Sequence, residues 1–344
     1  KEKDYDSAEI TCNKILNIDP NNFDTTLLSA SISGAKGNYK KAKELLLKAV
    51  EIQPKNTTVY NNLGSACKAL GELDEAQAFY EKTLSINPNH TNANFNLGLL
   101  FYQLKEIEKA KTLLEKTVEV QPNFALAHFN LGNLLAEMKE YMKAKKSYKK
   151  AIQLRPDLTS AHNNLGLANR FLGDYENAVN CYKEAIKINP NHAGAHSNLG
   201  RAQTELGDFE SAIKTLGKAT KLEPKNLYNY YYLCELKNNL LNEELINKVK
   251  KIIKDKSTTK RNLAYGNFLL AAYQRKGKNY KKEFDNLTKA HEFFFKTREN
   301  RFTLSVKYTF EDLIQISNFA NLDNPNKKSD FKIKPIFIVG VPRC

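Results

Sequence analysis

The residues with the clearest potential for anion chemistry stand at the end of the sequence, in residues 334–344. Residues 336–339 form an apolar run rich in β-branched side chains, which is typical of a buried parallel strand. A strand that enters a glycine-bearing loop is how phosphate-binding sites begin, because backbone amides then face the anion. The residues predicted to bind a phosphate-bearing cofactor are Gly340, Val341, Pro342, Arg343 and Cys344.

A second candidate site is a column of asparagines that recur every 34 residues: Asn62, Asn96, Asn130, Asn164 and Asn198. Because an asparagine side chain offers two donors and an acceptor, such a column can hold an extended peptide backbone without reading its side chains. The alternative is that each amide bonds to a neighbouring helix. Replacing all five by alanine separates the two readings, since a binding ladder loses peptide affinity whereas a structural ladder loses melting temperature.

Three histidines share the same spacing, namely His128, His162 and His196. Equivalent side chains on successive repeats lie about two helix contacts of 8–10 Å apart, too far for the ~2 Å bonds to a shared zinc ion. We therefore expect these rings to pack as Tyr60 does, and we expect no metal site. The five cysteines lack any metal-ligand or disulfide spacing, which favours free thiols in a reducing compartment and a cytoplasmic location.

The elements that position the asparagines follow from the same period of 34. Prolines recur at Pro20, Pro54, Pro88, Pro122, Pro156, Pro190 and Pro224, and an Asn-Leu-Gly triplet ends at Gly64, Gly98, Gly132, Gly166 and Gly200. The unit resembles the tetratricopeptide repeat (TPR), a hairpin of two helices. The resemblance implies a right-handed solenoid whose concave surface is lined by the first helices, where a protein or peptide partner binds.

Within the repeat at residues 57–90, each special residue has an expected role. The glycine at the eighth position and the alanine at the twentieth should let the two helices approach closely. Gly71 should make the turn between them, and Pro88 should end the second helix because it cannot donate the intrahelical hydrogen bond.

Six complete units occupy residues 23–226, after a partial unit at residues 1–22 that begins at its thirteenth position. We therefore expect a longer protein. The predicted domains are the array at 1–226, a divergent TPR-like helical region at 227–320, a linker at 321–334, and the start of another domain at 335–344. Helices are expected in the divergent region at 227–240, 242–255, 263–274, 280–295 and 302–319.

The net charge of +15 is concentrated near the C-terminus, since residues 227–344 carry 23 basic and 12 acidic side chains. Such a cluster is typical of a solvated face or attracts an acidic partner. No nucleic-acid-binding motif accompanies it, so an acidic peptide is favoured over nucleic acid. No run of 18 apolar residues exists, which excludes a membrane-spanning helix.

Residues 334–344 resemble the start of the catalytic domain in the bacterial TPR-sulfotransferases, where a strand leads into a Gly-x-Pro-Arg-Ser-Gly-Thr-Thr loop. Tyrosylprotein sulfotransferases share that loop. The resemblance implies that Gly340 to Cys344 bind the 5′-phosphosulfate of 3′-phosphoadenosine 5′-phosphosulfate (PAPS), with Arg343 stabilising charge on the sulfate and its leaving phosphate. Cys344 stands where serine is usual and is a weaker hydrogen-bond donor.

The sequence therefore predicts an all-α TPR superhelical solenoid followed by the first strand of an α/β sulfotransferase domain. Its predicted function is to recruit an acceptor to that domain, and residues 1–344 alone are not expected to transfer sulfate. A non-catalytic TPR scaffold is one alternative. The repeat arm of another nucleotide-dependent or glycosyl transferase is the other, because Gly340 also fits the start of a G-x-x-x-x-G-K-[ST] loop.

Overall fold

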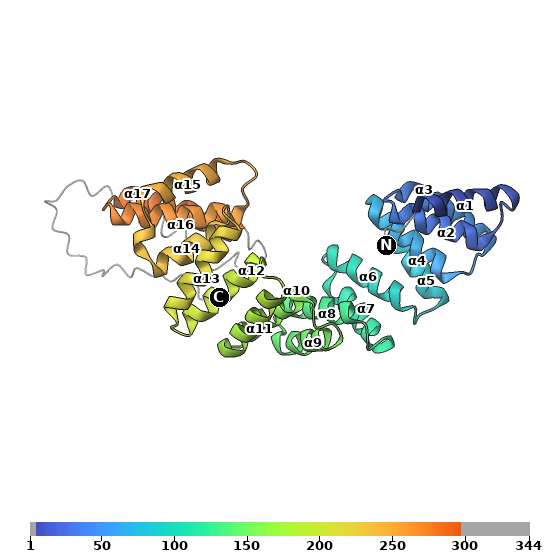
Figure 1. Ribbon diagram of the computed structural model, residues 1–344, viewed down its shortest axis with the longest axis horizontal. Helices are drawn as coiled ribbons and strands as arrows, with labels where there is room; N and C mark the ends of the chain where they lie inside the picture. The colour runs from blue at the N-terminus through green and yellow to red at the C-terminus, as the bar shows by residue number, and fades with distance from the viewer. Residues whose placement is uncertain (1–4, 297–344) are drawn as a thin grey trace, which may run out of the picture. The chain divides into compact units, whose positions relative to one another are not determined.

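The computed structural model describes residues 5–296, which contain seventeen α-helices and one short 3₁₀ turn (Figure 1). These residues belong to two compact units, one ending at Asn239 and the other beginning at Leu240. Residues 297–344 lie outside the described residues, and with them the expected helix at 302–319, the linker at 321–334 and the expected strand and loop at 335–344.

Unit 1 alternates two kinds of helix, as the repeat predicts. The first helices of the repeats are α2 (Phe23–Ala35), α4 (Thr57–Leu70), α6 (Thr91–Gln103), α8 (Ala125–Glu137), α10 (Thr159–Phe171), α12 (Ala193–Glu205) and α14 (Leu227–Leu236). The second helices are α1 (Tyr5–Ile18), α3 (Tyr39–Ile52), α5 (Leu73–Ile86), α7 (Ile107–Val120), α9 (Tyr141–Leu154), α11 (Tyr175–Ile188) and α13 (Phe209–Leu222). From α2 to α12, each first helix packs on the second helix of its own repeat and on that of the preceding repeat, and α14 packs on α13.

Local sequence sets where these helices begin and end. The side chain of Asn56 accepts from the amides of Thr58 and Val59 and so caps α4. Gly71 closes that helix in the left-handed conformation, with φ of 83°, which glycine adopts without steric cost. Asn87 after α5 is extended, as expected for a residue before proline. The predicted turn and stop signals are confirmed.

The eighth-position glycine lies against the second helix of its own repeat, as expected, and its nearest contact there is a large side chain. A Cβ added to Gly166 would lie 2.5 Å from Cε1 of Tyr182, the side chain sixteen residues later. Gly132 meets Tyr148 in the same way, at 2.7 Å. The twentieth-position alanines are fully buried, but the glycine's close contact is the side chain one turn beyond them. The glycine therefore makes room for a buried ring, or for a leucine in the repeats of Gly98 and Gly200.

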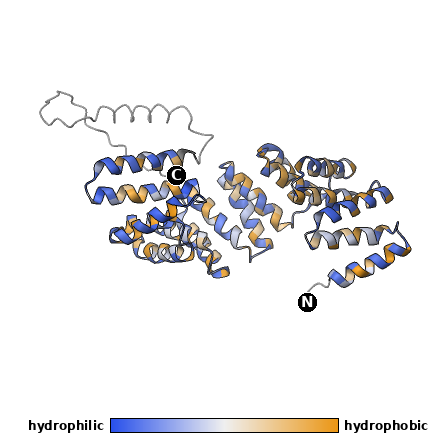
Figure 2. Cartoon of the chain, turned by 90° about the horizontal axis from the view of Figure 1, so that it is seen from above, coloured by the Kyte–Doolittle hydropathy of each residue, from blue (hydrophilic) through white to orange (hydrophobic). Residues whose placement is uncertain are grey.

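The core of unit 1 is a series of hydrophobic clusters, each of which spans neighbouring repeats. Its largest fully buried side chains are each at most 2% exposed: Tyr80, Tyr148, Tyr182, Leu63, Leu100, Leu114, Leu134, Leu216 and Leu227. Figure 2 shows hydrophobic and hydrophilic residues interleaved along the helices, as expected for amphipathic helices that each bury one stripe. A single repeat cannot bury its stripe alone, so neighbouring repeats stabilise each other.

Ion pairs join the second helices of successive repeats. Lysines pair with the carboxylates that begin the second helix of the next repeat: Lys43 with Glu72 at 2.7 Å, Lys111 with Glu140 at 3.0 Å and Lys145 with Asp174 at 3.2 Å. Hydrogen bonds from lysine lower the pKa of Glu72, and those from Lys143 and Lys111 lower that of Glu140. These pairs are solvated, so each contributes little.

Unit 2 contains α15 (Glu243–Lys254) and a hairpin of two long helices, α16 (Lys260–Lys276) and α17 (Tyr280–Lys296). The helices expected at 263–274 and 280–295 are thus confirmed, the first being longer than expected at both ends. The helix expected at 227–240 is wrong at its end. α14 stops at Leu236, and a 3₁₀ turn (Asn238–Leu240) follows, since asparagines compete with the helical backbone for hydrogen bonds.

The basic side chains of unit 2 are exposed. They include Lys248, Lys250, Lys251, Lys254, Lys256, Lys276, Lys278, Lys281 and Lys282. Among the described helices, none is long and apolar enough to cross a bilayer.

Candidate peptide-binding face of the first helices

The five predicted asparagines all lie on first helices of unit 1, at the sixth position of their repeats, and all are half-buried. Their side chains form hydrogen bonds within the array, mostly to the fifth or ninth position of the preceding repeat. Asn198 donates to Asn163 at 3.0 Å, and Asn164 donates to Asn133 at 2.8 Å. The structure therefore brings the ladder together with a second set of amides.

These bonds join into one continuous relay across three first helices. Asn198 on α12 donates to Oδ1 of Asn163 on α10, and Nδ2 of Asn163 donates to Oδ1 of Asn164 at 3.0 Å. Asn164 then donates to Oδ1 of Asn133 on α8, which also accepts from the Tyr148 hydroxyl at 2.9 Å. Because Asn163 and Asn164 each donate one hydrogen bond and accept another, the relay fixes the orientation of both amides.

A shorter relay lies nearer the N-terminus, where Asn96 donates to Asn61 at 3.2 Å and Asn61 donates to Asn62 at 3.4 Å. The two relays are separated because the fifth position of the third and fourth repeats holds Phe95 and Phe129 instead of an amide or hydroxyl. The remaining member of the ladder, Asn130, donates to the carbonyl of Leu126 in its own helix at 2.8 Å. The ladder is therefore uneven in its bonding, although it is regular in sequence.

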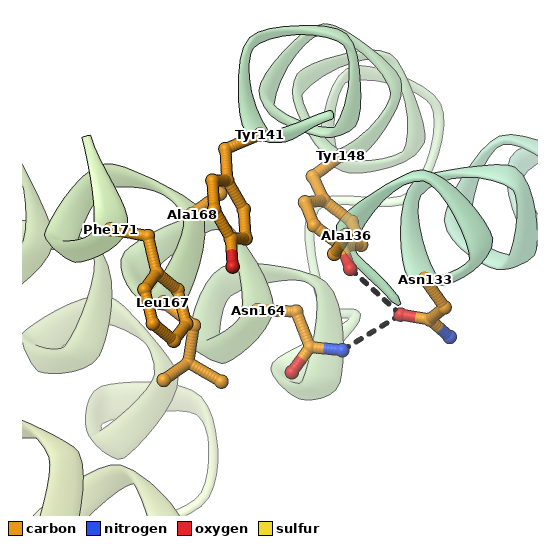
Figure 3. A pocket seen from close by; sticks show the side chains of 8 residues that line it. All are labelled: Asn133, Ala136, Tyr141, Tyr148, Asn164, Leu167, Ala168 and Phe171. Atoms are coloured by element: carbon orange, nitrogen blue, oxygen red, sulfur yellow. Dashed lines mark hydrogen bonds between the residues drawn. The ribbon is translucent and has the colours of Figure 1, made fainter. Parts of the chain in front are cut away.

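A cavity of about 320 Å³ opens on this face between the fourth and fifth repeats. It is lined by Asn133, Ala136, Tyr141, Tyr148, Asn164, Leu167, Ala168 and Phe171, from α8, α9 and α10. Figure 3 shows the rings of Tyr141 and Phe171 on one side, with Asn164 bonded to Asn133 at the other. The ring centroids of Tyr141 and Phe171 are 4.7 Å apart and their planes differ by 8°, so the two rings stack.

At this cavity the twelfth position of the repeat carries a small side chain, as it also does in the first and sixth repeats, which hold Gly34 and Thr204. Ala136 stands there in the fourth repeat, whereas Lys68, Tyr102 and Arg170 stand at the same position in the second, third and fifth repeats. Tyr102 reaches the next repeat, where its hydroxyl donates to Glu137 at 2.6 Å. Burial raises the pKa of Tyr102, and the Glu137 carboxylate raises it further.

Arg170 lies beside the cavity and is unusually buried for an arginine, with 9% of its surface exposed. Its guanidinium carbon is 4.8 Å from the ring centroid of Phe171, which lines the cavity. Its Nε has no hydrogen-bond partner, and no carboxylate among the described residues lies within ion-pair distance of it. The side chain is therefore a largely buried cation that stacks on a ring. Burial raises the pKa of the Tyr182 hydroxyl and Arg170 opposes that rise, so the guanidinium also lies near this hydroxyl.

Arginine also meets aromatic rings one repeat further on. The guanidinium carbon of Arg201 lies 4.7 Å from the ring centroid of Tyr232 and 5.5 Å from that of Tyr228. Arg201 also donates to the Tyr228 hydroxyl. The first helices from α10 to α14 thus present cations held on aromatic faces.

Comparison with known proteins identifies the repeat. Tetratricopeptide-repeat models match residues 21–89, 56–123, 125–158 and 193–226, and a TPR-repeat model matches residues 171–207. The chain belongs to the tetratricopeptide-repeat family. No curated protein matches the chain.

Solved TPR structures share this fold. YrrB, described as a TPR protein with an unusual peptide-binding site, is 23% identical over 55% of this chain and 98% of YrrB, with a TM-score of 0.52. PilF of Pseudomonas aeruginosa is 21% identical over 68% of this chain and 100% of its own, with a TM-score of 0.56. A chain of the APC/C hetero-tetramer Cut9–Hcn1 is 18% identical over 83% of this chain and 52% of its own, with a TM-score of 0.51.

The histidines of the TPR array pack as expected, and the structure adds the reason for their spacing. Nε2 of His128, His162 and His196 lies 2.9, 2.9 and 3.0 Å from the carbonyl oxygens of Pro122, Pro156 and Pro190. Since a carbonyl only accepts, Nε2 carries the proton and donates. The Tyr60 hydroxyl makes the same bond to Pro54 at 3.0 Å. The fourth position thus satisfies a loop carbonyl that the proline leaves without a helical partner.

One cluster in the array has ligand atoms spaced closely enough for a metal ion, namely Cys67, Glu72 and Glu75. Lys43 already binds both carboxylates at 2.7 Å, so its ammonium group stands where a cation would bind. Burial raises the pKa of the Cys67 thiol to about 11, which keeps it protonated at neutral pH. This cluster is an ion pair between two repeats.

Sequence reasoning did not find the fifth- and ninth-position amides, the cavity or Arg170. The alignment of repeats gives only a partial signal, because Ala136 is smaller than the lysine, tyrosine and arginine of three other repeats, whereas Gly34 and Thr204 are also small. The predicted PAPS-binding residues, Gly340 to Cys344, lie outside the described residues.

Proposed function

We propose that the first-helix face of unit 1 binds an extended protein or peptide segment, so that the chain works as a TPR interaction scaffold. The observation that carries this proposal is the asparagine relay from α8 to α12, which holds amide groups in fixed orientations along one face. Such amides can exchange hydrogen bonds with a peptide backbone. YrrB, which shares the fold, is described as having a peptide-binding site.

The relay leaves capacity for a ligand. Asn198 uses one of its two Nδ2 hydrogens within the array, and no described residue donates to its Oδ1. Asn96 is placed in the same way at the end of the shorter relay. A half-buried amide whose orientation is already fixed loses less conformational entropy on binding than a free surface side chain.

The test uses the full chain and a display library of random twelve-residue peptides. Enriched peptides are labelled, and their affinity is measured by fluorescence anisotropy for the wild type and for a triple variant, Asn96→Ala, Asn130→Ala and Asn198→Ala. We expect a loss of about tenfold or more, since several hydrogen bonds of about 1 kcal/mol each are removed. Asn191→Ala, in an exposed loop, is the matched control.

The ladder would be structural, and this proposal wrong, if the triple variant lowered the melting temperature strongly while its folded fraction bound the peptides as the wild type does. Failure to enrich any peptide would also contradict the proposal.

We propose further that the scaffold recruits an acceptor to a PAPS-dependent sulfotransferase domain. The support for this part is the sequence of residues 334–344 alone, in which Arg343 would oppose negative charge on the transferred sulfate. Bound PAPS would supply the activated sulfate. Sequencing the gene past the codon for Cys344 tests the proposal, because a Gly-Thr-Thr continuation followed by an amphipathic helix supports it. A Gly-Lys-Ser or Gly-Lys-Thr continuation favours a nucleotide triphosphatase, and any other continuation removes the support for PAPS.

A further inference from the structure

We propose that the peptide bound by this face carries an apolar side chain and an acidic side chain within two residues of each other. The apolar side chain enters the cavity between α8, α9 and α10, and the acidic one pairs with Arg170. The inference rests on the proposed function and names the chemistry of the ligand.

The cavity suits one apolar side chain. Its volume of about 320 Å³ is at the lower end of the range of small-ligand pockets, and its walls are mostly aromatic and aliphatic. Tyr141 and Phe171, whose rings stack on each other, line one side of the cavity, where an aromatic or branched side chain can pack (Figure 3). Removing such a side chain from water favours binding.

Asn164 connects the cavity to the asparagine ladder, because it belongs to both. Its Nδ2 donates to Asn133, and its Oδ1 accepts from Asn163. A peptide backbone that lies along the ladder therefore passes the opening of the cavity, and a side chain directed at the array at that point enters it.

Arg170 gives the site its charge preference. Burial of a guanidinium without a carboxylate is costly, and an acidic ligand group supplies the missing counter-charge. Arg170 and Phe171 are consecutive, and the guanidinium stacks on the Phe171 ring that lines the cavity. Consecutive Cα atoms of a peptide are only about 3.8 Å apart, so the acidic residue has to lie close in sequence to the apolar one.

The experiment uses the peptides enriched from the display library on the full chain. We expect them to share Phe, Tyr, Leu or Ile within two residues of Asp or Glu. Ala136→Tyr places in the cavity the side chain that the third repeat already carries at this position, as Tyr102. We expect it to weaken binding by about ten- to a hundredfold, because the peptide then loses the free energy of burying one apolar side chain. Ala69→Tyr, at an exposed position of the second repeat, is the matched control.

Arg170→Gln tests the charge. Each selected peptide is compared with a version in which its acidic residue is Gln or Asn. We expect the wild type to prefer the acidic peptide by about tenfold and Arg170→Gln to remove most of that preference, since hydrogen bonds to charged groups are among the stronger ones. Arg155→Gln, an exposed arginine after α9, should leave the preference unchanged.

Phe171→Ala removes one wall at a side chain that is 44% exposed, so it tests the cavity even if Ala136→Tyr fails to fold. Peptides that bind Ala136→Tyr or Phe171→Ala with wild-type affinity would overturn this inference, as would an acid preference that survives Arg170→Gln. Both results would leave the proposed function standing. If no peptide is enriched at all, the proposed function fails together with the inference.

Discussion

Two successive repeat boundaries in unit 1 are built from the same repeat and carry different side chains. Between the third and fourth repeats, the Tyr102 hydroxyl crosses the boundary and donates to Glu137 at 2.6 Å. Between the fourth and fifth repeats, Ala136 cannot reach Phe171, and a cavity of about 320 Å³ remains. Both boundaries keep a lysine–carboxylate pair on their second helices. The repeated residues thus fix the scaffold, and the variable twelfth and thirteenth positions create the site.

The amides also differ along the array, as the fifth positions of the third and fifth repeats show. The fifth repeat holds Asn163 at its fifth position, and this side chain joins the bonds of Asn198 and Asn164 into one relay. The third repeat holds Phe95 there, whose ring centroid lies 4.8 Å from that of Phe124. One substitution at a fixed position therefore changes a hydrogen-bonded face into an aromatic one.

The largest effect is expected from Asn163→Ala, which removes the centre of the relay. It leaves a donor of Asn198 and an acceptor of Asn164 without their partners, so we expect a loss of about 2 to 3 kcal/mol in the free energy of unfolding. Urea denaturation followed by circular dichroism measures it.

Asn130→Ala is the comparison, because Asn130 bonds only to the carbonyl of Leu126 in its own helix. We expect it to cost under about 1 kcal/mol. Equal losses in the two variants would show that the relay adds nothing beyond single hydrogen bonds.

A steric test compares Gly98 and Gly132, the eighth residues of the third and fourth repeats, which lie on either side of the boundary between those repeats. A Cβ on Gly132 would lie 2.7 Å from Tyr148, which must then move, so Gly132→Ala should cost about 1 to 2 kcal/mol. A Cβ on Gly98 would lie 3.2 Å from Leu114, and the better helix propensity of alanine should offset that contact.

Thermal and urea denaturation of both glycine variants provide the measurement. If Gly132→Ala were as stable as Gly98→Ala, the Tyr148 ring would be free to move aside, and the relay that ends on Asn133 would not depend on its position.

A double variant can reproduce the Tyr102–Glu137 hydrogen bond at the boundary between the fourth and fifth repeats. Ala136→Tyr together with Phe171→Glu recreates the Tyr102–Glu137 pair one repeat later. We expect a favourable coupling of about 1 kcal/mol between the two changes, the value of a typical hydrogen bond. A double-mutant cycle in urea measures it. Zero coupling would mean that the two boundaries differ in backbone geometry as well as in side chains.

The smallest effect is expected from pH, and it should be the same at both boundaries. The pKa of Glu140 is held below its ordinary value of 4.5, mainly by hydrogen bonds from Lys143 and Lys111, and that of Asp174 below 3.8, mainly by the hydrogen bond from Asn177. Because the folded pKa is depressed, this stabilisation is present above the ordinary value and is lost as the pH falls through the folded value. The melting temperature should therefore fall between about pH 5 and pH 3.

Lys111→Met and Lys145→Met should each reduce that pH dependence slightly and to a similar extent. If only one of the two variants changed the pH dependence, the Lys111–Glu140 and Lys145–Asp174 pairs would not contribute equally to stability.

Most of the fold could be predicted from sequence because its signals are local. A proline ends each second helix by removing a backbone donor, and glycine after α4 permits the left-handed turn, so both act within a few residues. The end of α14 was missed, since Lys237 and the asparagines after it stop the helix without a proline or glycine.

The asparagine ladder could be predicted as a column but not as a relay. Its partners at the fifth and ninth positions lie 31 or 35 residues away in the chain, and only the stacking of first helices brings them within 3.2 Å. Whether the ladder binds a peptide stays a prediction.

The sequence alone determined the 34-residue unit, its helices and the family, because propensity, turn and stop signals act over a few residues and repeat without change. Tertiary structure decided which side chains meet across a boundary: the relay, the cavity above Ala136 and the buried charge of Arg170. These features depend on packing between repeats, where one side chain's size sets the space left for its neighbour. The regular helices of the array therefore follow from signals within each repeat, whereas its candidate binding site depends on packing between repeats.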